Sequence, residues 1–83
     1  MEFLEENILN LAILEMAKRK NGASFCPSEV VRWIYPADWQ FFMGDVNEAM
    51  MDLYRGGWIN VTQKDKAIDP NFLPQGPVKI KLK

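Results

Sequence analysis

The spacing of apolar and polar positions along the chain predicts three helices followed by two strands. Apolar residues recur at helical spacing over residues 5–20, 26–35 and 38–55, and at every second position over residues 58–63 and 78–83. The last segment is the most regular, because lysines separate Val78, Ile80 and Leu82. Successive side chains of a strand point to opposite faces, so these three are expected to cover a core while the lysines face water.

The first predicted helix is apolar around more of its circumference than one buried stripe requires. Its main stripe consists of Leu4, Ile8, Leu11 and Ala12. Three more apolar residues widen this face: Leu9, Ile13 and Met16. Either the core covers more than one side of this helix, or a partner covers the rest. Asn21 and Gly22 are expected to end it, since both tolerate the left-handed C-cap conformation.

The second helix has clear signals at both ends. Pro27 suits the first helical position, and Glu29 is placed to accept a hydrogen bond from the N–H of the cap residue Cys26. The step from Tyr35 to Pro36 is expected to end the helix, because a residue before proline avoids the α region. The side chains predicted to face inward are Val30, Trp33 and Ile34.

The third helix begins near Asp38, a plausible N-cap, and ends at Gly56 and Gly57. Gly44 is expected to mark a break inside it. Its apolar residues match an amphipathic helix over three turns, and the predicted buried stripe is Phe42, Val46, Ala49, Met50 and Leu53.

The order of these elements predicts a winged-helix domain. Three helices, a strand, a loop that begins at Lys64 and a final strand fit within 83 residues, a length for one domain over residues 1–83. The expected fold class is therefore α+β, a three-helix, helix-turn-helix bundle followed by a two-stranded β-wing. This fold carries DNA binders, RNA binders and protein-contact modules, so it leaves the function open.

Candidate catalytic chemistry is sparse, and we expect no enzyme, no cofactor and no metal site. The chain has no histidine, which removes the commonest general base and metal ligand. It has no glycine-rich phosphate loop of standard spacing. Cys26, the single cysteine, lies at a helix N-terminus, where a thiol can be activated. No basic residue is close to it in sequence, and we interpret it as a small buried residue or a cap.

Charge is distributed unevenly although the net charge is only −1. Residues 1–58 hold five Lys/Arg against nine Asp/Glu, whereas residues 59–83 hold five lysines against two aspartates. A basic surface of this kind can hold phosphates without reading sequence. The candidate nucleic-acid-binding residues are Arg32, Gln63, Lys64, Lys66, Lys79 and Lys81. The alternative is a solvated lysine face that deters edge-to-edge aggregation.

Base reading by the third helix is not expected. Its outward positions by helical geometry are Gly44, Glu48, Met51, Asp52 and Arg55. Carboxylates there would be repelled by the closely spaced phosphates of a duplex.

A protein-contact module is the alternative function, most simply a homodimer through the first helix. The broad apolar face of that helix supports it, as does Met51 on an otherwise acidic surface. Trp39, Phe41 and Tyr54 leave the third helix on its flanks and could join an interface, although Trp39 and Trp58 are interpreted as core or core-edge residues.

Three segments resemble a known family of small bacterial proteins. They are Cys-Pro-Ser-Glu-Val at residues 26–30, Val-Thr-Gln-Lys-Asp-Lys-Ala-Ile-Asp-Pro at residues 61–70 and Gly-Pro-Val-Lys-Ile-Lys-Leu at residues 76–82, together with the pair Asp38-Trp39. The family is the domain of unknown function 3253. The resemblance implies a winged-helix-like fold and a bacterial, cytoplasmic protein, and it implies no activity. The acidic N-terminus and the lack of a long apolar stretch agree with a protein that has no signal peptide and no membrane partner.

Overall fold

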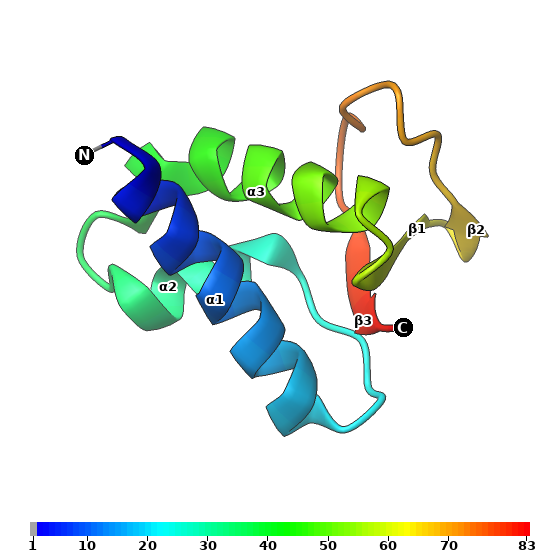
Figure 1. The fold of residues 1–83 in the computed structure, drawn as a ribbon, viewed down its shortest axis with the longest axis horizontal. Coiled ribbons are helices and arrows are strands. Elements are labelled where there is room, and N and C mark those ends of the chain that lie inside the picture. The colour runs from blue at the N-terminus through cyan, green and yellow to red at the C-terminus, as the bar shows by residue number, and fades with distance from the viewer. Residues whose placement is uncertain (1) are drawn as a thin grey trace.

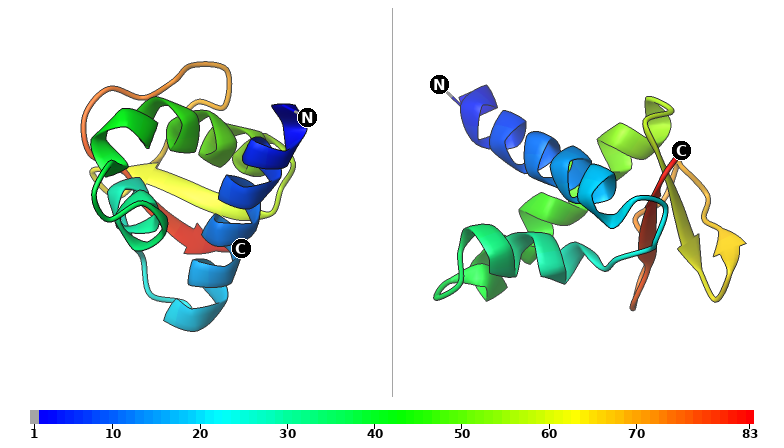
Figure 2. Two further views of the ribbon diagram at one scale, coloured as in Figure 1. Left: turned by 90° about the vertical axis from the view of Figure 1, so that its left-hand side faces the viewer. Right: turned by 90° about the horizontal axis from the view of Figure 1, so that it is seen from below.

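Three helices pack against one face of a small antiparallel sheet in the computed structural model, which describes the backbone of residues 2–83 and the side chains of residues 8–83 (Figure 1). The elements in order are α1 (Glu2–Lys20), α2 (Pro27–Ile34), the 3₁₀ turn η1 (Trp39–Phe42), α3 (Met43–Arg55), β1 (Ile59–Gln63), β2 (Lys66–Ala67) and β3 (Lys79–Leu82). The left view of Figure 2 shows the helices in front of the sheet, whose other face points away from them. This arrangement confirms the predicted winged-helix-like α+β class.

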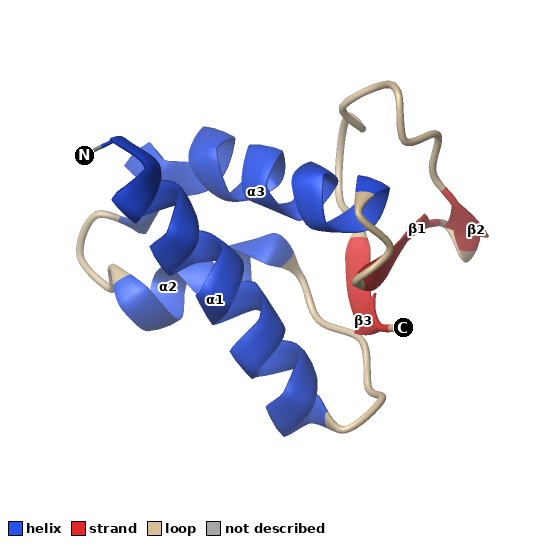
Figure 3. Cartoon of the chain, in the orientation of Figure 1, coloured by secondary structure: helices blue, strands red, loops and turns tan. Residues whose placement is uncertain are grey.

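The sheet has three strands in the order β2-β1-β3, all antiparallel, where two strands were expected. The extra strand forms because Lys64 and Asp65 make a two-residue turn with φ of 53° and 67°. Positive φ at both central residues matches the twist of a tight hairpin, so the chain folds back at once and Lys66 pairs with Gln63. The expected loop therefore begins only after β2, and it runs past the end of α3 before entering β3 (Figure 3).

The core-facing pattern of the sheet follows the alternation in the sequence. Ile59, Val61, Val78 and Ile80 are buried, as predicted. Leu82, which was expected to cover the core, is 38% exposed because it lies at the end of β3 beyond the helices. Phe25 is buried completely and pairs with Ile80 through two backbone hydrogen bonds, of 2.9 and 2.7 Å. The link between α1 and α2 is thereby fastened to the open edge of β3.

The predicted register of α3 is confirmed at four of its five positions. Val46, Ala49, Met50 and Leu53 are buried, whereas Phe42 belongs to η1 and is half-buried. Met51 was expected on the outward face and is instead 1% exposed. The prediction was wrong because α3 contacts α1, α2 and β1, so that more than one side of this helix is covered.

The inward side of α1 differs from the predicted stripe. The buried residues are Leu9, Ala12, Ile13 and Ala17, whereas Ile8 and Leu11 are 45% and 64% exposed. Leu4 lies outside the residues whose side chains the structure describes. Small Ala12 and Ala17 let α1 pack closely, because they leave room for α2, α3 and β3 to approach its backbone.

Two tryptophans are also more exposed than predicted. Trp33 was expected in the core and is 45% exposed, because α2 turns Val31 inward beside Val30, whose burial was predicted. Trp58, interpreted as a core or core-edge residue, is 61% exposed where the chain leaves α3. Trp39 is half-buried and packs against the core, which agrees with a core-edge position.

The predicted helix ends are largely confirmed. Asn21 and Gly22 have φ of 52° and 96° after α1, and Pro27 is the first residue of α2. Asp38 makes no side-chain cap, because the chain enters α3 through η1. The break expected near Gly44 is this change from 3₁₀ to α geometry. Among the described residues, no helix combines the length and the apolar character needed to cross a bilayer.

Candidate interaction surfaces

The register of the sheet divides the predicted basic site between two faces. Lys79 lies opposite Thr62, and Lys81 lies opposite Asn60. Directly opposite residues point to the same side, and this side is opposite to buried Val61 and Ile80. These four residues form the outer face of the sheet. Both lysines are exposed.

Gln63 and Lys66 lie on the other side of the sheet, beyond the edge of the core. They are paired with each other, and Gln63 follows Thr62 directly in β1. Successive side chains of a strand point to opposite sides, so Gln63 and Lys66 point away from the outer face. The side-chain amide of Gln63 donates to the carbonyl oxygen of Gln75 and, at 3.4 Å, to that of Pro77. Gln63 therefore fixes the long loop after β2, and its donors are engaged within the protein. Lys64 lies at the tip of the tight turn.

Arg32 does not join either lysine group. Its guanidinium lies 4.2 Å from the centre of the Trp39 ring, a cation–π contact between α2 and η1. In Figure 1, the green segment that follows α2 lies at the opposite end of the molecule from β2. The six predicted site residues are thus not one surface, and Lys79 and Lys81 are the pair that the fold brings together.

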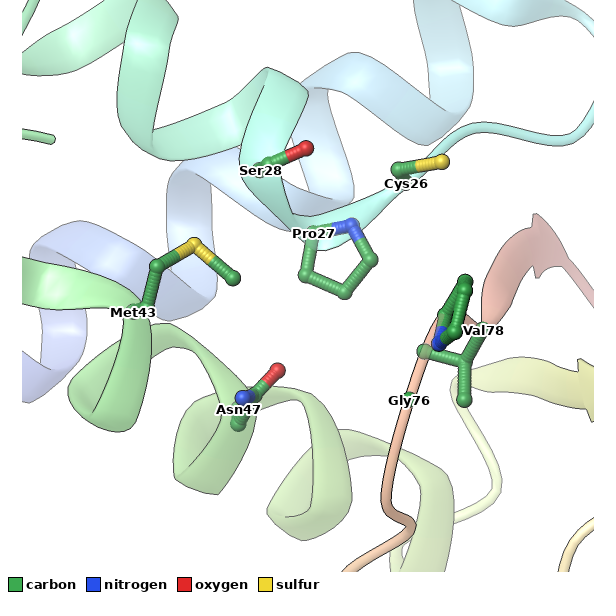
Figure 4. Close-up of a pocket in the computed structure, with 8 residues that line it drawn as sticks. Cys26, Pro27, Ser28, Met43, Asn47, Gly76 and Val78 are labelled. Atoms are coloured by element: carbon green, nitrogen blue, oxygen red, sulfur yellow. The ribbon is translucent and has the colours of Figure 1, made fainter. Parts of the chain in front are cut away.

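A junction between α2 and β3 was not visible in the sequence. The ammonium of Lys79 lies 3.5 Å from the sulfur of Cys26, although 53 residues separate them. The carboxylate of Glu29 accepts a hydrogen bond of 2.9 Å from the N–H of Cys26 and forms an ion pair of 3.4 Å with Lys20. A small cavity of about 140 Å³ lies beside it, lined by residues that include Cys26, Ser28, Met43, Asn47 and Val78 (Figure 4).

The environment of Glu29 favours its ionised form. The hydrogen bond from Cys26 lowers the pKa of Glu29 below its ordinary value; Lys20 and Lys79 add to this, and partial burial opposes it. Ionised Glu29 therefore stabilises the fold at neutral pH, and this contribution is lost as the pH falls through the lowered pKa.

Glu29→Gln is expected to lower stability at neutral pH and to have little effect in acid. The side chain is 42% exposed, so the expected loss is at the lower end of the usual contribution of a carboxylate in a first helical turn, about 0.3–1 kcal/mol at low salt. Thermal melting of both proteins from pH 7 to well below 4.5 would measure it. A difference of constant size across this range would contradict the electrostatic explanation.

The outward face of α3 is acidic. Asp45, Glu48 and Asp52 are all exposed there. Arg55 is the nearby cation, and its guanidinium is engaged, with one nitrogen 2.7 Å from Asp52 and the other 3.1 Å from the carbonyl oxygen of Pro70. The loop after β2 thus lies against the end of α3, where Tyr54 also donates to the carbonyl oxygen of Ile68 at 2.6 Å.

Family membership follows from the comparison of the sequence with known families. The profile of the family described as protein of unknown function (DUF3253) matches residues 4–83. This chain belongs to the DUF3253 family. A search of curated proteins finds no match.

The segments that resemble DUF3253 have structural explanations in this fold. Residues 26–30 start α2, with Pro27 at its first position and Glu29 bound to the cap N–H. Residues 61–70 form β1, the tight turn, β2 and the start of the loop. Gly76, with φ of 87°, lies where the amide of Gln63 holds the loop. These DUF3253 segments fasten the wing to the helices.

An apolar surface lies along α1 where this helix faces α2. Ile8 and Leu11 of α1 and Trp33 of α2 are each 45% or more exposed. They line a groove of about 510 Å³ between these helices, together with Leu14, Glu15 and Lys18. The excess apolar character of the first helix predicted such a surface, but the contribution of Trp33 required the structure.

Proposed function

We propose that the protein is a non-enzymatic binding module that holds polyanions, nucleic acid backbones among them, on the outer face of its sheet. The observation that carries this proposal is the pairing of Lys79 with Thr62 and of Lys81 with Asn60 on one exposed side. Two ammonium groups, a hydroxyl and an amide are donors that suit phosphate oxygens. Side chains directly opposite one another have β-carbons about 5 Å apart, which is close enough for them to share one phosphate group.

The shape and the charge of this surface support the proposal. The four residues line a hollow of about 370 Å³, and Ser24, which also lines it, adds a hydroxyl. Asp65, which also lines it, is the carboxylate that opposes an anion there. The ammonium of Lys79 also contacts the sulfur of Cys26, whereas Lys81 lies nearer the centre of β3.

The acidic face of α3 restricts the kind of contact. A helix that carries Asp45, Glu48 and Asp52 outward cannot approach the major groove closely, because duplex DNA has one charge per about 1.7 Å of its axis. The proposed binding is therefore to phosphates alone and is independent of base sequence.

Replacing Lys79 and Lys81 with Gln is expected to weaken binding to a labelled duplex about tenfold or more. Fluorescence anisotropy at low salt would measure it, starting from a dissociation constant in the usual non-specific range of about 1–100 μM. The logarithm of the affinity should fall with the logarithm of salt concentration by about 0.9 per phosphate contacted, and the double variant should show a flatter slope.

Replacing Lys64 and Lys66 with Gln is the matched control. It removes the same number of charges at the tight turn and on the other side of the sheet, and neither residue lines the hollow, so its affinity should stay close to that of the unaltered protein. Equal loss in both variants would show that overall charge, and not the outer face, controls binding. An absence of binding at about 100 μM protein in low salt, beyond the usual non-specific range, would end the proposal.

A further inference from the structure

One side of α1 forms an exposed strip along the groove toward α2. The strip consists of apolar Ile8 and Leu11 followed by charged Glu15 and Lys18. Their spacing of three, four and three residues places them on one side of a helix. Ile8 and Leu11 are 45% and 64% exposed, and Trp33 of α2 extends the apolar area across the groove. Within the described residues, no other segment of the chain covers this surface.

The charges of α1 are arranged with opposite signs at its two ends. The sequence of its first turns contains Glu2, Glu5 and Glu6, and its last turn contains Lys18, Arg19 and Lys20. Lys18 lines the groove itself, and the Arg19 guanidinium lies 5.2 Å from the centre of the Trp33 ring. The basic end of α1 therefore borders the apolar groove.

This charge pattern fits a second copy of the same helix in the reverse direction. An antiparallel pair sets the acidic end of each helix beside the basic end of the other and also aligns the helix dipoles favourably. A parallel pair would set like charges side by side over the whole length. With the two-fold axis at Leu11, Ile8 of one copy meets Leu14 of the other, and the two copies of Leu11 meet each other.

We propose that the protein forms a two-fold homodimer in which the α1 helices run antiparallel and close the groove between α1 and α2. The interface is independent of the proposed polyanion surface, since it lies on the helices and not on the sheet. The interface would consist mainly of one helix and one tryptophan from each copy, which is a small contact for a stable complex. The dimer is accordingly expected to dissociate at micromolar concentrations.

Analytical ultracentrifugation over a concentration series tests whether the dimer forms, and Leu11→Glu is the test variant. The unaltered protein should shift from monomer to dimer as its concentration rises through the micromolar range. Leu11→Glu should remain a monomer at every concentration, because two carboxylates would meet at the axis. Leu11 is 64% exposed, so the variant should keep its helical circular dichroism. A monomer at about 1 mM unaltered protein, or a Leu11→Glu variant that still dimerises, would overturn the proposal.

Disulfide cross-linking tests the direction of the helices. In a background of Cys26→Ser, which removes the single cysteine, Leu11→Cys should give a covalent dimer on mild oxidation. Lys18→Cys should not, because the two copies of residue 18 are about 21 Å apart along antiparallel helices with a rise of 1.5 Å per residue. Cross-linking of both variants would indicate parallel helices and overturn the proposed arrangement.

Discussion

Val46→Asp is expected to unfold the domain. The side chain of Val46 is fully buried near the start of α3, and no buried charged residue lies in the described core to pair with a new carboxylate. Burial of an unpaired polar group costs several kcal/mol, and a charge costs more. A chain of this size has a total stability of about 4–12 kcal/mol, so one such change removes most or all of it. Loss of helical circular dichroism and of a cooperative thermal transition would show the effect.

Glu48→Asp is the matched control for this variant. It places an aspartate two residues away on the exposed side of the same helix, where only the lower helix propensity of aspartate acts, at a cost of a few tenths of a kcal/mol. A Val46→Asp protein that melts cooperatively near the temperature of the control would mean that the register of α3 described above is wrong.

Phe25→Ala is expected to lower the free energy of unfolding by about 3–5 kcal/mol, the usual loss for a buried aromatic residue. The ring is fully buried although it lies in the link between two helices, and its backbone is paired with Ile80 on the edge of β3. Its removal leaves a cavity where α1, α2 and the sheet meet. Urea denaturation followed by tryptophan fluorescence would give the difference, because the chain contains three tryptophans.

Phe41→Ala tests whether position or residue type causes this loss. Phe41 is 81% exposed in η1, so the same truncation there should change stability by less than about 0.5 kcal/mol. Similar losses in the two variants would contradict the assignment of Phe25 to the core.

The candidate polyanion surface was predictable in part. The strict alternation of residues 78–83 predicts that Lys79 and Lys81 share one face, because strand geometry is local. The separation of Lys66 from them depends on the turn at Lys64 and Asp65, which lacks the Asn-Gly or Asp-Gly pattern that marks a tight hairpin. A shift of one residue along a strand moves a side chain to the other face of the sheet. Because the turn was not predicted, Gln63 and Lys66 were grouped with lysines that lie on the opposite face.

The apolar groove shows a different limit. The sequence indicates that α1 is apolar on too many sides for one core, but it does not indicate which arc turns inward. That choice was made by the close approach of α2, α3 and β3, which favoured the side with Ala12 and Ala17 and left Ile8 and Leu11 outside. Trp33 lies at the same groove because the short α2 buries Val31, and not Trp33, together with Val30.

The order of the three helices and of β1 and β3, the positions Val46, Ala49, Met50 and Leu53 of α3 and the inward side of most of the sheet were determined by the sequence alone. Each depends on a period of 3.6 or 2 residues that local geometry imposes on buried positions. The burial of Phe25 and Met51, the contact of Lys79 with Cys26 and the division of the lysines were decided only by the tertiary structure. These features join segments far apart in the chain, and packing between such segments leaves no periodic pattern in either of them.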